Sequence, residues 1–316
     1  MQDIAAGDDP QITAALRVIT RLDADVLLLT GFDHDVLGVA ATEFAIALAA
    51  SGIDYPHRLA LAPNTGIPTG RDLDRNGRLG EARDAQGYGR FPGQAGMLLL
   101  SRLPLGPARD LSGLLWADLP ENHMPVDDPA RDIQRLSTTG HWLVPLTLPD
   151  GRQITLAAWA ATPPVFDGPE DRNGRRAGDE ALLWAQLLDG ALPDHPAPDS
   201  LVLIGLSNLD PTDGEGPRGA MATLLAHPAL QDPAPRGAHG RTEPAHQGDP
   251  ALDTADFAAG IGGLRVDYIL PAASLDVTAA GVMWPGAGDP LLEDLAATSP
   301  HFPVWVDLAL AAPQSP

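Results

Sequence analysis

Residues 26–35 read VLLLTGFDHD, and this stretch indicates the class of fold. Val26 and the leucines at 27–29 form a short, wholly apolar run that follows a segment with helical periodicity. Such a run is typical of a buried strand in an α/β sheet. Ligands gather at the carboxyl ends of buried strands, yet Thr30 and Gly31 stand there and offer little chemistry. The stretch therefore predicts a strand that is aimed at a site but brings no reactive group to it.

Helices and strands alternate on both sides of this run. Asp9 and Pro10 have the character of an N-cap and first helical residue, which predicts a helix over 10–22. The pattern predicts further helices over 36–50 and from 179, a hairpin over 141–160, and strands over 58–62 and 97–101 and from 200, 265 and 303. The Gly- and Pro-rich stretches 63–96 and 228–256 read as long surface loops. We expect one domain over residues 1–316, with its core at about 8–310 and the architecture of an α/β sandwich with mixed sheets.

Composition excludes several kinds of function. The formal net charge is −22, from 42 acidic and 20 basic residues, and every basic residue is Arg. Such a field disfavours non-specific binding to nucleic acid, which requires a basic surface. Cysteine is absent, so the chain has no disulfide, thiol nucleophile or thiolate metal site.

The sequence also bears on location. No apolar run approaches the length of a membrane span, and the start, MQDIAAGDDP, lacks the basic and apolar regions of a signal peptide. As written, the chain is expected to be soluble with no signal peptide. It would be secreted or periplasmic if the true start lay upstream.

Five segments together resemble the endonuclease/exonuclease/phosphatase superfamily, in particular a bacterial branch that is often secreted. They are PNTGIPTGRDLDRNGRLG (63–80), YGRFPGQAGMLLLSRLPL (88–105), TPPVFDGPEDRNGRR (162–176), LIGLSNLDPTDGEG (203–216) and LRVDYILP (264–271). The resemblance implies a DNase I-like four-layer α/β sandwich, with two mixed sheets face to face and helices outside. It also implies metal-assisted phosphoester hydrolysis, in which Mg²⁺ held by carboxylates offsets the charge on the phosphate.

The same resemblance indicates which positions of this chain correspond to the catalytic and metal-binding residues of the family. At four of these positions the chain carries a different residue. Gly31 stands where relatives carry a metal-binding Glu, and Ala160 stands where they carry a His that contacts phosphate. Leu206 replaces the Asp that orients water, and Pro300 replaces an acidic residue. The Mg²⁺ site expected for the family is therefore predicted to be lost, because Mg²⁺ requires hard oxygen ligands.

Three family positions are retained, and they are the candidate catalytic residues. Asn208 remains beside Leu206, and His301 remains with Asp267, the carboxylate that orients it in relatives. Relatives also open with a strand that ends in Asn, placed before the helix expected at 10–22. The fold is thus expected to lack that first strand, either because the start was assigned too far downstream or because a core strand was lost.

A calcium loop is the second candidate metal site. Asp72, Asp74, Asn76 and Gly77 fit positions 1, 3, 5 and 6 of such a loop, although Arg83 occupies the closing position. Glu81 or Asp84 could close the site in a shifted loop. The alternative is a turn that binds no ion, and the sequence favours neither.

The remaining candidates are weaker. Arg90 and Arg176 could present guanidinium groups to a phosphate ester, although Arg residues in so acidic a chain more often tie loops together. The residues Asp33, His34 and Asp35 could substitute for lost ligands if the loop folded back, but they read better as a solvated loop.

Two functions follow. The first is a pseudoenzyme or binding module, descended from metal-dependent phosphoester hydrolases, whose partners the sequence does not name. The alternative is an active divalent-metal-dependent phosphodiesterase or phosphatase with a rearranged site that uses His301 and Asp267.

Overall fold

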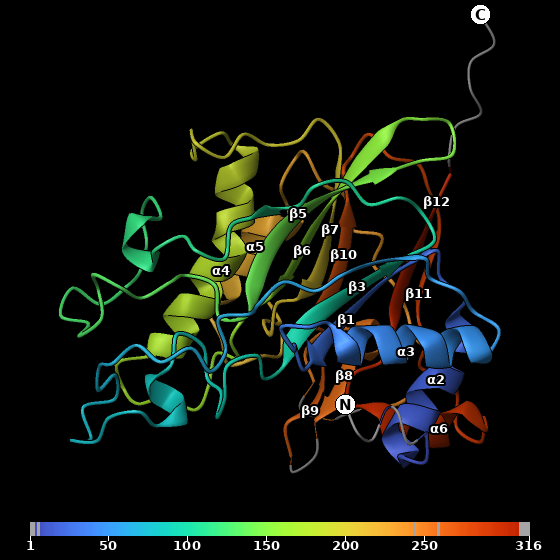
Figure 1. The fold of residues 1–316 in the computed structure, drawn as a ribbon, viewed down its shortest axis with the longest axis horizontal. Helices are drawn as coiled ribbons and strands as arrows, with labels where there is room; N and C mark the ends of the chain where they lie inside the picture. The colour runs from blue at the N-terminus through green and yellow to red at the C-terminus, as the bar shows by residue number, and fades with distance from the viewer. Residues whose placement is uncertain (1–3, 5–6, 243, 245, 258–259, 310–316) are drawn as a thin grey trace, which may run out of the picture.

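The computed structural model describes residue 4 and residues 7–242, 244, 246–257 and 260–309 (Figure 1). Its helices are α2 (Pro10–Leu22), α3 (Val39–Ala50), α4 (Arg172–Leu188), α5 (Arg218–Leu225) and α6 (Leu291–Thr298). Its strands are β1 (Val26–Phe32), β2 (His57–Leu59), β3 (Gly96–Ser101), β4 (Arg109–Asp110), β5 (Gly140–Thr147), β6 (Gln153–Ala160), β7 (Leu201–Leu206), β8 (Ala255–Phe257), β9 (Gly262–Leu264), β10 (Asp267–Pro271), β11 (Val277–Val282) and β12 (Val304–Leu308). None of the described helices has the length and apolarity to cross a bilayer.

The strands form two principal sheets. The larger has the order β10-β7-β6-β5-β4 and is mixed, because β6 and β7 run parallel while the other neighbours are antiparallel. The smaller has the order β1-β3-β2 and is antiparallel throughout. Two-stranded ribbons, β11-β12 and β8-β9, complete the described strands.

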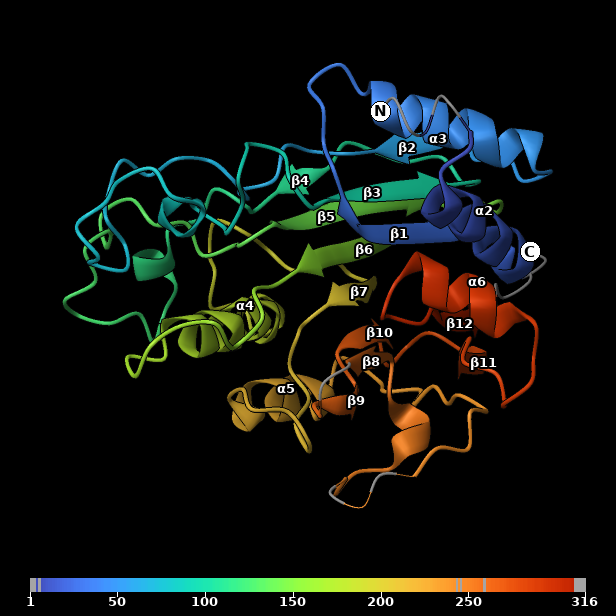
Figure 2. The same cartoon turned by 90° about the horizontal axis from the view of Figure 1, so that it is seen from below.

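Three apolar clusters separate four layers (Figure 2). One, which includes Leu99 of β3 and Trp142 of β5, fills the space between the two sheets. A second packs α2 and α3 on the outer face of β1 and β3, and the third packs α4 and α5 on the outer face of the larger sheet. The expected four-layer α/β sandwich is therefore confirmed, although only the larger sheet is mixed.

The helix at α4 begins at Arg172, about two turns earlier than the sequence pattern predicts. Its first turns contain two glycines and read as a loop. Tertiary contacts stabilise them instead: the buried Arg176 guanidinium donates to the carbonyl oxygens of residues 135–137. The start of α3 differs in the other direction: the helix begins at Val39, three residues later than the predicted start at 36. Asp35 accepts hydrogen bonds from the N–H groups of its first two residues and so marks this start.

The smaller sheet has an open edge. Among the described residues β1 pairs only with β3, and β12 pairs only with β11. A groove of about 1290 Å³ lies between these two strands, and every residue of both lines it. The leucines of β1 are consequently half-buried rather than buried as the apolar run predicts. No described strand occupies the place between β1 and β12.

Candidate functional site

The ends of three neighbouring strands bring three of the positions singled out in the sequence into one row. Ala160 at the end of β6 pairs with Leu206 at the end of β7, and Leu206 pairs in turn with Asp267 at the start of β10. Parallel pairing of β6 with β7 puts their carboxyl ends together, while β10 runs back from the same edge. Of the three side chains in this row, only that of Asp267 is polar.

Asp267 holds His301 in a defined orientation. The imidazole Nδ1 of His301 lies 2.8 Å from Asp267 Oδ2, and the Thr254 hydroxyl donates to the same oxygen at 2.9 Å. Burial lowers the pKa of His301, but the charge and hydrogen bond of Asp267 more than offset this, so the pKa is raised above its usual value. With Nδ1 bonded to Asp267, Nε2 is the atom through which this imidazole could meet a ligand.

Asn208 sits next to the row in a left-handed conformation, with φ of 57°. Its side-chain amide donates to the carbonyl oxygen of Ala161 at 2.8 Å, which ties the end of β7 to the end of β6. The structure thus gives this residue a structural contact and leaves its Oδ1 as the atom that could face a ligand.

Gly31 lies on the other side of the groove, in a β-bulge of β1. The pairing with β3 shifts register between Thr30 and Phe32, and Gly31 has φ of 75°. No heavy atom stands within 4 Å of where its Cβ would be. The position therefore has room for a side chain but a backbone conformation that favours glycine. Gly31, Asp267 and His301 all line the same groove.

Pro300, the residue before His301, helps to hold this segment in place through its backbone. Its carbonyl oxygen accepts the Asp256 N–H at 2.9 Å, and its neighbour Ser299 accepts the His301 N–H through the side-chain hydroxyl. These bonds fix the approach of His301 to Asp267 from a short segment after α6.

The residues at the strand ends do not fit Mg²⁺. That ion requires hard oxygen ligands in octahedral geometry. Gly31 has no side chain, the side chains of Ala160 and Leu206 are apolar, and Asp267 is already bonded to His301 and Thr254. Within the described ranges, no group of three or more His, Asp and Glu side chains with ligand spacing includes Asp267 or His301.

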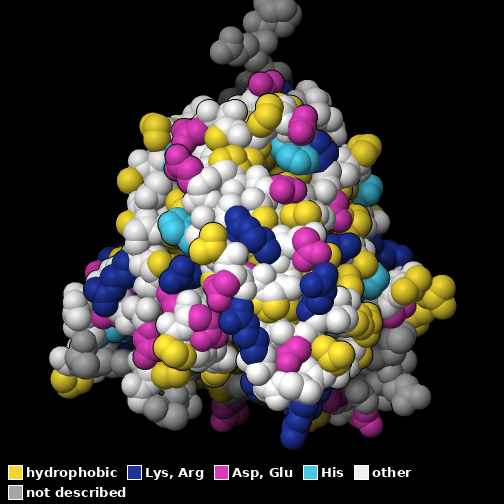
Figure 3. Space-filling view, turned by 90° about the vertical axis from the view of Figure 1, so that its left-hand side faces the viewer, with side chains coloured by type: hydrophobic (Ala, Val, Ile, Leu, Met, Phe, Trp, Pro, Cys, Tyr) yellow, Lys and Arg dark blue, Asp and Glu magenta, His cyan; other side chains and the backbone are white. Residues whose placement is uncertain are grey.

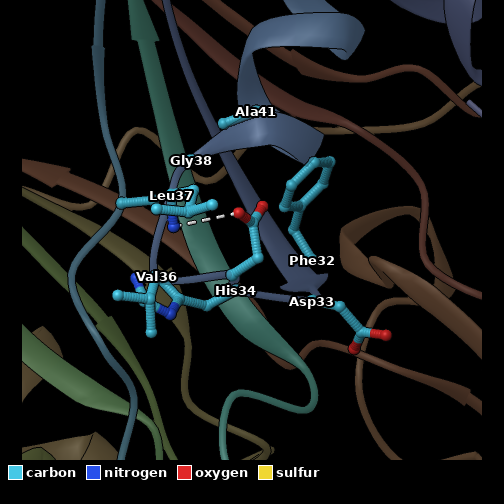
Figure 4. A pocket seen from close by; sticks show the side chains of 9 residues that line it. Phe32, Asp33, His34, Val36, Leu37, Gly38 and Ala41 are labelled. Carbon is cyan, nitrogen blue, oxygen red and sulfur yellow. Dashed lines mark hydrogen bonds between the residues drawn. The ribbon is translucent and has the colours of Figure 1, made fainter. Parts of the chain in front are cut away.

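In the segment after β1, the carboxylates of Asp33 and Asp35 accept hydrogen bonds from backbone N–H groups. Asp35 accepts hydrogen bonds from the N–H groups of Leu37, Val39 and Ala40, which lower its pKa and cap α3. Asp33 accepts from the Ala95 N–H at 2.8 Å. These residues line a small pocket of about 220 Å³ (Figure 4), in which the Asp33 carboxylate points away from the other side chains. The structure uses the segment to start a helix and to anchor a loop.

A carboxylate cluster does form in the loop predicted to bind calcium. Ligand oxygens of Asp72, Asp74 and Asp84 all lie within 4.8 Å of one another, so Asp84 provides the third carboxylate that the sequence pattern left open. Asn76 lies within this loop, but its amide donates to Asp74 and Glu81 and its oxygen accepts the Arg78 N–H. Arg83 bonds to Asp74 at 2.9 Å and partly neutralises the cluster. None of residues 72–84 lines the groove at His301, so the two sites are separate.

The structure places the two candidate arginines differently. Arg176 is 3% exposed, and its guanidinium is bonded to backbone carbonyls. This leaves it no surface for a substrate, and the predicted contact is not supported. Arg90 is exposed in a loop whose Gly93 carbonyl accepts the His34 N–H. Figure 3 shows Arg and Asp or Glu side chains interspersed on the face at the left of Figure 1, without a broad basic patch.

Two supporting groups have no recognisable sequence signal. Thr254 orients Asp267, but it precedes β8 in an ordinary loop sequence. Glu180 is fully buried in α4 and accepts the Thr138 and Thr162 N–H groups, which lie next to the row on the β5 and β6 sides. Burial raises the pKa of Glu180 to about 7. Both contacts join residues distant in the chain, so no local pattern announces them.

Comparison with known proteins agrees with this architecture. The chain is similar in structure to an endonuclease/exonuclease/phosphatase from Beutenbergia cavernae (TM-score 0.56, 21% identity, covering 96% of this chain and 66% of that one). It is also similar to a family protein from Leptotrichia buccalis (TM-score 0.53, 15% identity, covering 95% and 93%). A third similar structure is the 3'-5' exonuclease NExo from Neisseria meningitidis (TM-score 0.50, 16% identity, covering 95% and 94%). At these identities the likeness establishes the fold alone.

No curated protein matches the chain. The sequence profile of the Endonuclease/Exonuclease/phosphatase family, in contrast, matches residues 3–301. This span includes β1, the row of strand ends and His301. The chain therefore belongs to the endonuclease/exonuclease/phosphatase family.

Proposed function

We propose that this protein is a catalytically silent member of its family that acts as a binding module. The observation that carries the proposal is the row Ala160–Leu206–Asp267 at the strand ends. Two of its three side chains can neither accept a proton nor orient a water molecule. Across the groove, Gly31 supplies no ligand to a metal.

The retained groups are consistent with binding. His301 carries a raised pKa and is fixed by Asp267, so it can present a positively charged imidazole to an anionic group. A phosphate ester is the ligand chemistry that such a group and the family fold suit best. Catalysis would require in addition a nucleophile and an oxygen-ligated metal.

Hydrolysis assays test the proposal. The purified protein is incubated with a model phosphodiester and a model phosphomonoester, each with Mg²⁺ or Mn²⁺, beside the variant His301→Ala. We expect no difference between the two proteins. Hydrolysis by the natural protein that exceeds the variant's would overturn the proposal and favour the alternative, a rearranged active site that uses His301 and Asp267.

We also infer that the cluster Asp72, Asp74 and Asp84 takes Ca²⁺ in a structural role. Calcium accepts several carboxylate oxygens in flexible geometry, and the cluster lies apart from the groove. Because Arg83 already bonds to Asp74, the affinity is expected to be low. Calorimetric titration should show Ca²⁺ binding that Asp72→Asn abolishes and Arg83→Ala strengthens. No heat of binding with any of the three proteins would refute it.

A further inference from the structure

His246 lies between two carboxylates in the interior of the protein. Its Nε2 is 3.1 Å from Asp213 Oδ2 and 3.5 Å from Asp253 Oδ1, and all three side chains are less than one-tenth exposed. The protonated ring can pair with both carboxylates at once, whereas the neutral ring has one N–H and no charge. His246 therefore bridges the loop after β7 and the segment before β8.

Asp213 fixes the first end of this bridge. Its carboxylate also accepts the Gln247 N–H at 2.7 Å and the Gly248 N–H at 2.9 Å. The N–H of Asp213 donates in turn to the side chain of Asp210 at 3.0 Å. One end of the bridge is thus held in a loop that begins at the row of strand ends.

Asp253 is the second end, and the residue after it contacts the dyad. The Thr254 hydroxyl donates to Asp267 Oδ2 at 2.9 Å and accepts the backbone N–H groups of Val266 and Asp267, each at 3.0 Å. Three hydrogen bonds of one hydroxyl therefore hold the start of β10 against this segment.

The same segment also holds the other member of the dyad. The Thr254 carbonyl oxygen accepts the Phe302 N–H at 2.7 Å, and Ala255 forms a β-bridge with His301. Residues 253–256 therefore contact both the strand that contains Asp267 and the segment that contains His301. A displacement of residues 253–256 would change the distance between the two side chains.

The charge of a further carboxylate bears on His246. Arg236 pairs with Asp249 and is the main cause of its lowered pKa, to which the charge of His246 adds a smaller contribution. Among the described residues, Asp249 thus already has a cationic partner outside the bridge.

We propose that the protonated His246 is a positioning residue for the His301–Asp267 dyad. By bridging two carboxylates it holds residues 253–256, which contact both members of the dyad. Loss of the charge on His246 at higher pH loosens this segment and separates the pair. The proposal rests on the proposed function only for the use of the site, since the geometry of the dyad is measurable without a ligand.

NMR titration of the natural protein, from about pH 5 to about pH 9, tests the proposal without a variant. The ring signals of His246 give the midpoint of its titration. We expect the amides of residues 254–256 to show a component with this midpoint. Their hydrogen exchange, corrected for its intrinsic pH dependence, should be at least ~10-fold faster above the midpoint than below it.

A variant separates positioning from the effect of charge. His246→Gln removes the charge, and we expect the pKa of His301 to fall toward its ordinary value because Asp267 is no longer held against the ring. Charge alone would act in the opposite direction, since removing a nearby positive group raises the pKa of an imidazole. The matched control His227→Gln breaks another His–Asp pair, 3.2 Å from Asp189, and should leave the pKa of His301 unchanged.

Two further proteins show whether the effect passes through the dyad. In the background Asp267→Asn, His246→Gln should not lower the pKa of His301 further, because the carboxylate through which it acts is absent. Asp213→Asn neutralises one end of the bridge with little change of shape. It should lower the pKa of His301 in the same direction as His246→Gln, but by less.

Three results would overturn the proposal. One is that the amides of residues 254–256 do not respond to the titration of His246. Another is a pKa of His301 that is unchanged or raised in both His246→Gln and Asp213→Asn. The third is an equal fall in His227→Gln. Hydrolysis of a phosphoester, in contrast, would overturn the proposed function and leave this positioning role intact.

Discussion

The two sheets of this molecule differ in how completely their strands are paired and buried. We call the larger sheet with α4 and α5 the closed half, and the smaller sheet with α2, α3 and the β11-β12 ribbon the open half. In the larger sheet β6 is paired on both edges, and the side chains of β5 and β6 are mostly buried. Among the residues that the structure describes, β1 in the smaller sheet is paired on one edge, as β12 is in its ribbon, and both strands are half-buried. Gly31 and His301 both lie at the open groove. The candidate site therefore lies where the strands are least covered by the rest of the fold.

The closed half also contains a buried polar network. Glu180 connects α4 to the ends of β5 and β6, and Asp179 beside it accepts the indole N–H of Trp116 at 2.6 Å. Such a network is stable only when its members are satisfied, and it defines the packing of the layer around it. We therefore expect substitutions in the closed half to have the larger effects.

Tryptophan truncation should show the largest contrast. Trp184 is 1% exposed in the cluster between α4 and the larger sheet, whereas Trp305 on β12 is half-buried at the groove. We expect Trp184→Ala to lower the free energy of unfolding by about 3–5 kcal/mol because it leaves a cavity. Trp305→Ala should cost about 1–2 kcal/mol, since less apolar area is lost from burial. Urea unfolding of both variants measures this, and equal losses would contradict the contrast.

Glu180 should make the stability of the closed half depend on pH. Its pKa is about 7 in the folded protein, above the ordinary value of 4.5, so the folded state holds the proton more tightly than the unfolded state. The free energy of unfolding should therefore fall, by about 3 kcal/mol in total, as the pH rises from about 4.5 to about 7. Glu180→Gln should remove this slope, because the amide does not titrate. The variant should also be less stable overall, since the amide can accept fewer of the N–H groups.

Urea unfolding at several pH values, with the natural protein beside Glu180→Gln, checks the slope. Glu43→Gln, a substitution in α3 of the open half, is a suitable comparison. A slope that persists unchanged in Glu180→Gln would show that another group is responsible.

Glycine substitution probes the bulge of the open half. Gly31→Ala should cost about 1–2 kcal/mol because a Cβ disfavours the left-handed conformation, although the position has space for it. Gly113→Ala is the matched control, since no heavy atom lies near its Cβ either and no positive φ is present. Thermal unfolding should separate the two. If Gly31→Ala were neutral, the bulge would not be what keeps glycine at this position.

The smallest effect on stability is expected at the dyad, where the informative quantity is a pKa. Asp267 raises the pKa of His301, so Asp267→Asn should lower it. The stability that the dyad contributes is fully present below the pKa of the unfolded His and is lost as the pH rises through the folded pKa. Thr254→Val should leave most of the shift, since the carboxylate remains. NMR titration of the His301 ring gives both values, and an unchanged pKa in Asp267→Asn would refute the pairing.

Sequence patterns predicted most elements because periodicity is local. The helix at 10–22 begins with its Asp9 cap as expected, and the hairpin of β5 and β6 turns around 149–151. The first turns of α4 were missed because their stability comes from Arg176 and the carbonyls of a segment some forty residues earlier. The same long-range contact removes Arg176 from the surface, where its charge alone would place it.

At the candidate site, the sequence shows which side-chain types are present, but it does not show which of them lie in contact. The sequence indicated that Gly31, Ala160 and Leu206 lack the groups that metal chemistry requires, and the side chains alone settle that point. It also suggested Asp84 as one of two residues that could close the carboxylate loop. Neither Thr254 behind Asp267 nor the separation of that loop from the groove could be read from it.

The layers of this protein, and the lack of ligand groups on Gly31, Ala160 and Leu206, can be read from the amino-acid sequence, because apolar periodicity and side-chain type are properties of single segments. That Ala160, Leu206 and Asp267 form one row, and that β1 and β12 border one groove, is seen only in the folded chain. Register and edge pairing join segments far apart in the chain, and their energies depend on partners that no local pattern specifies.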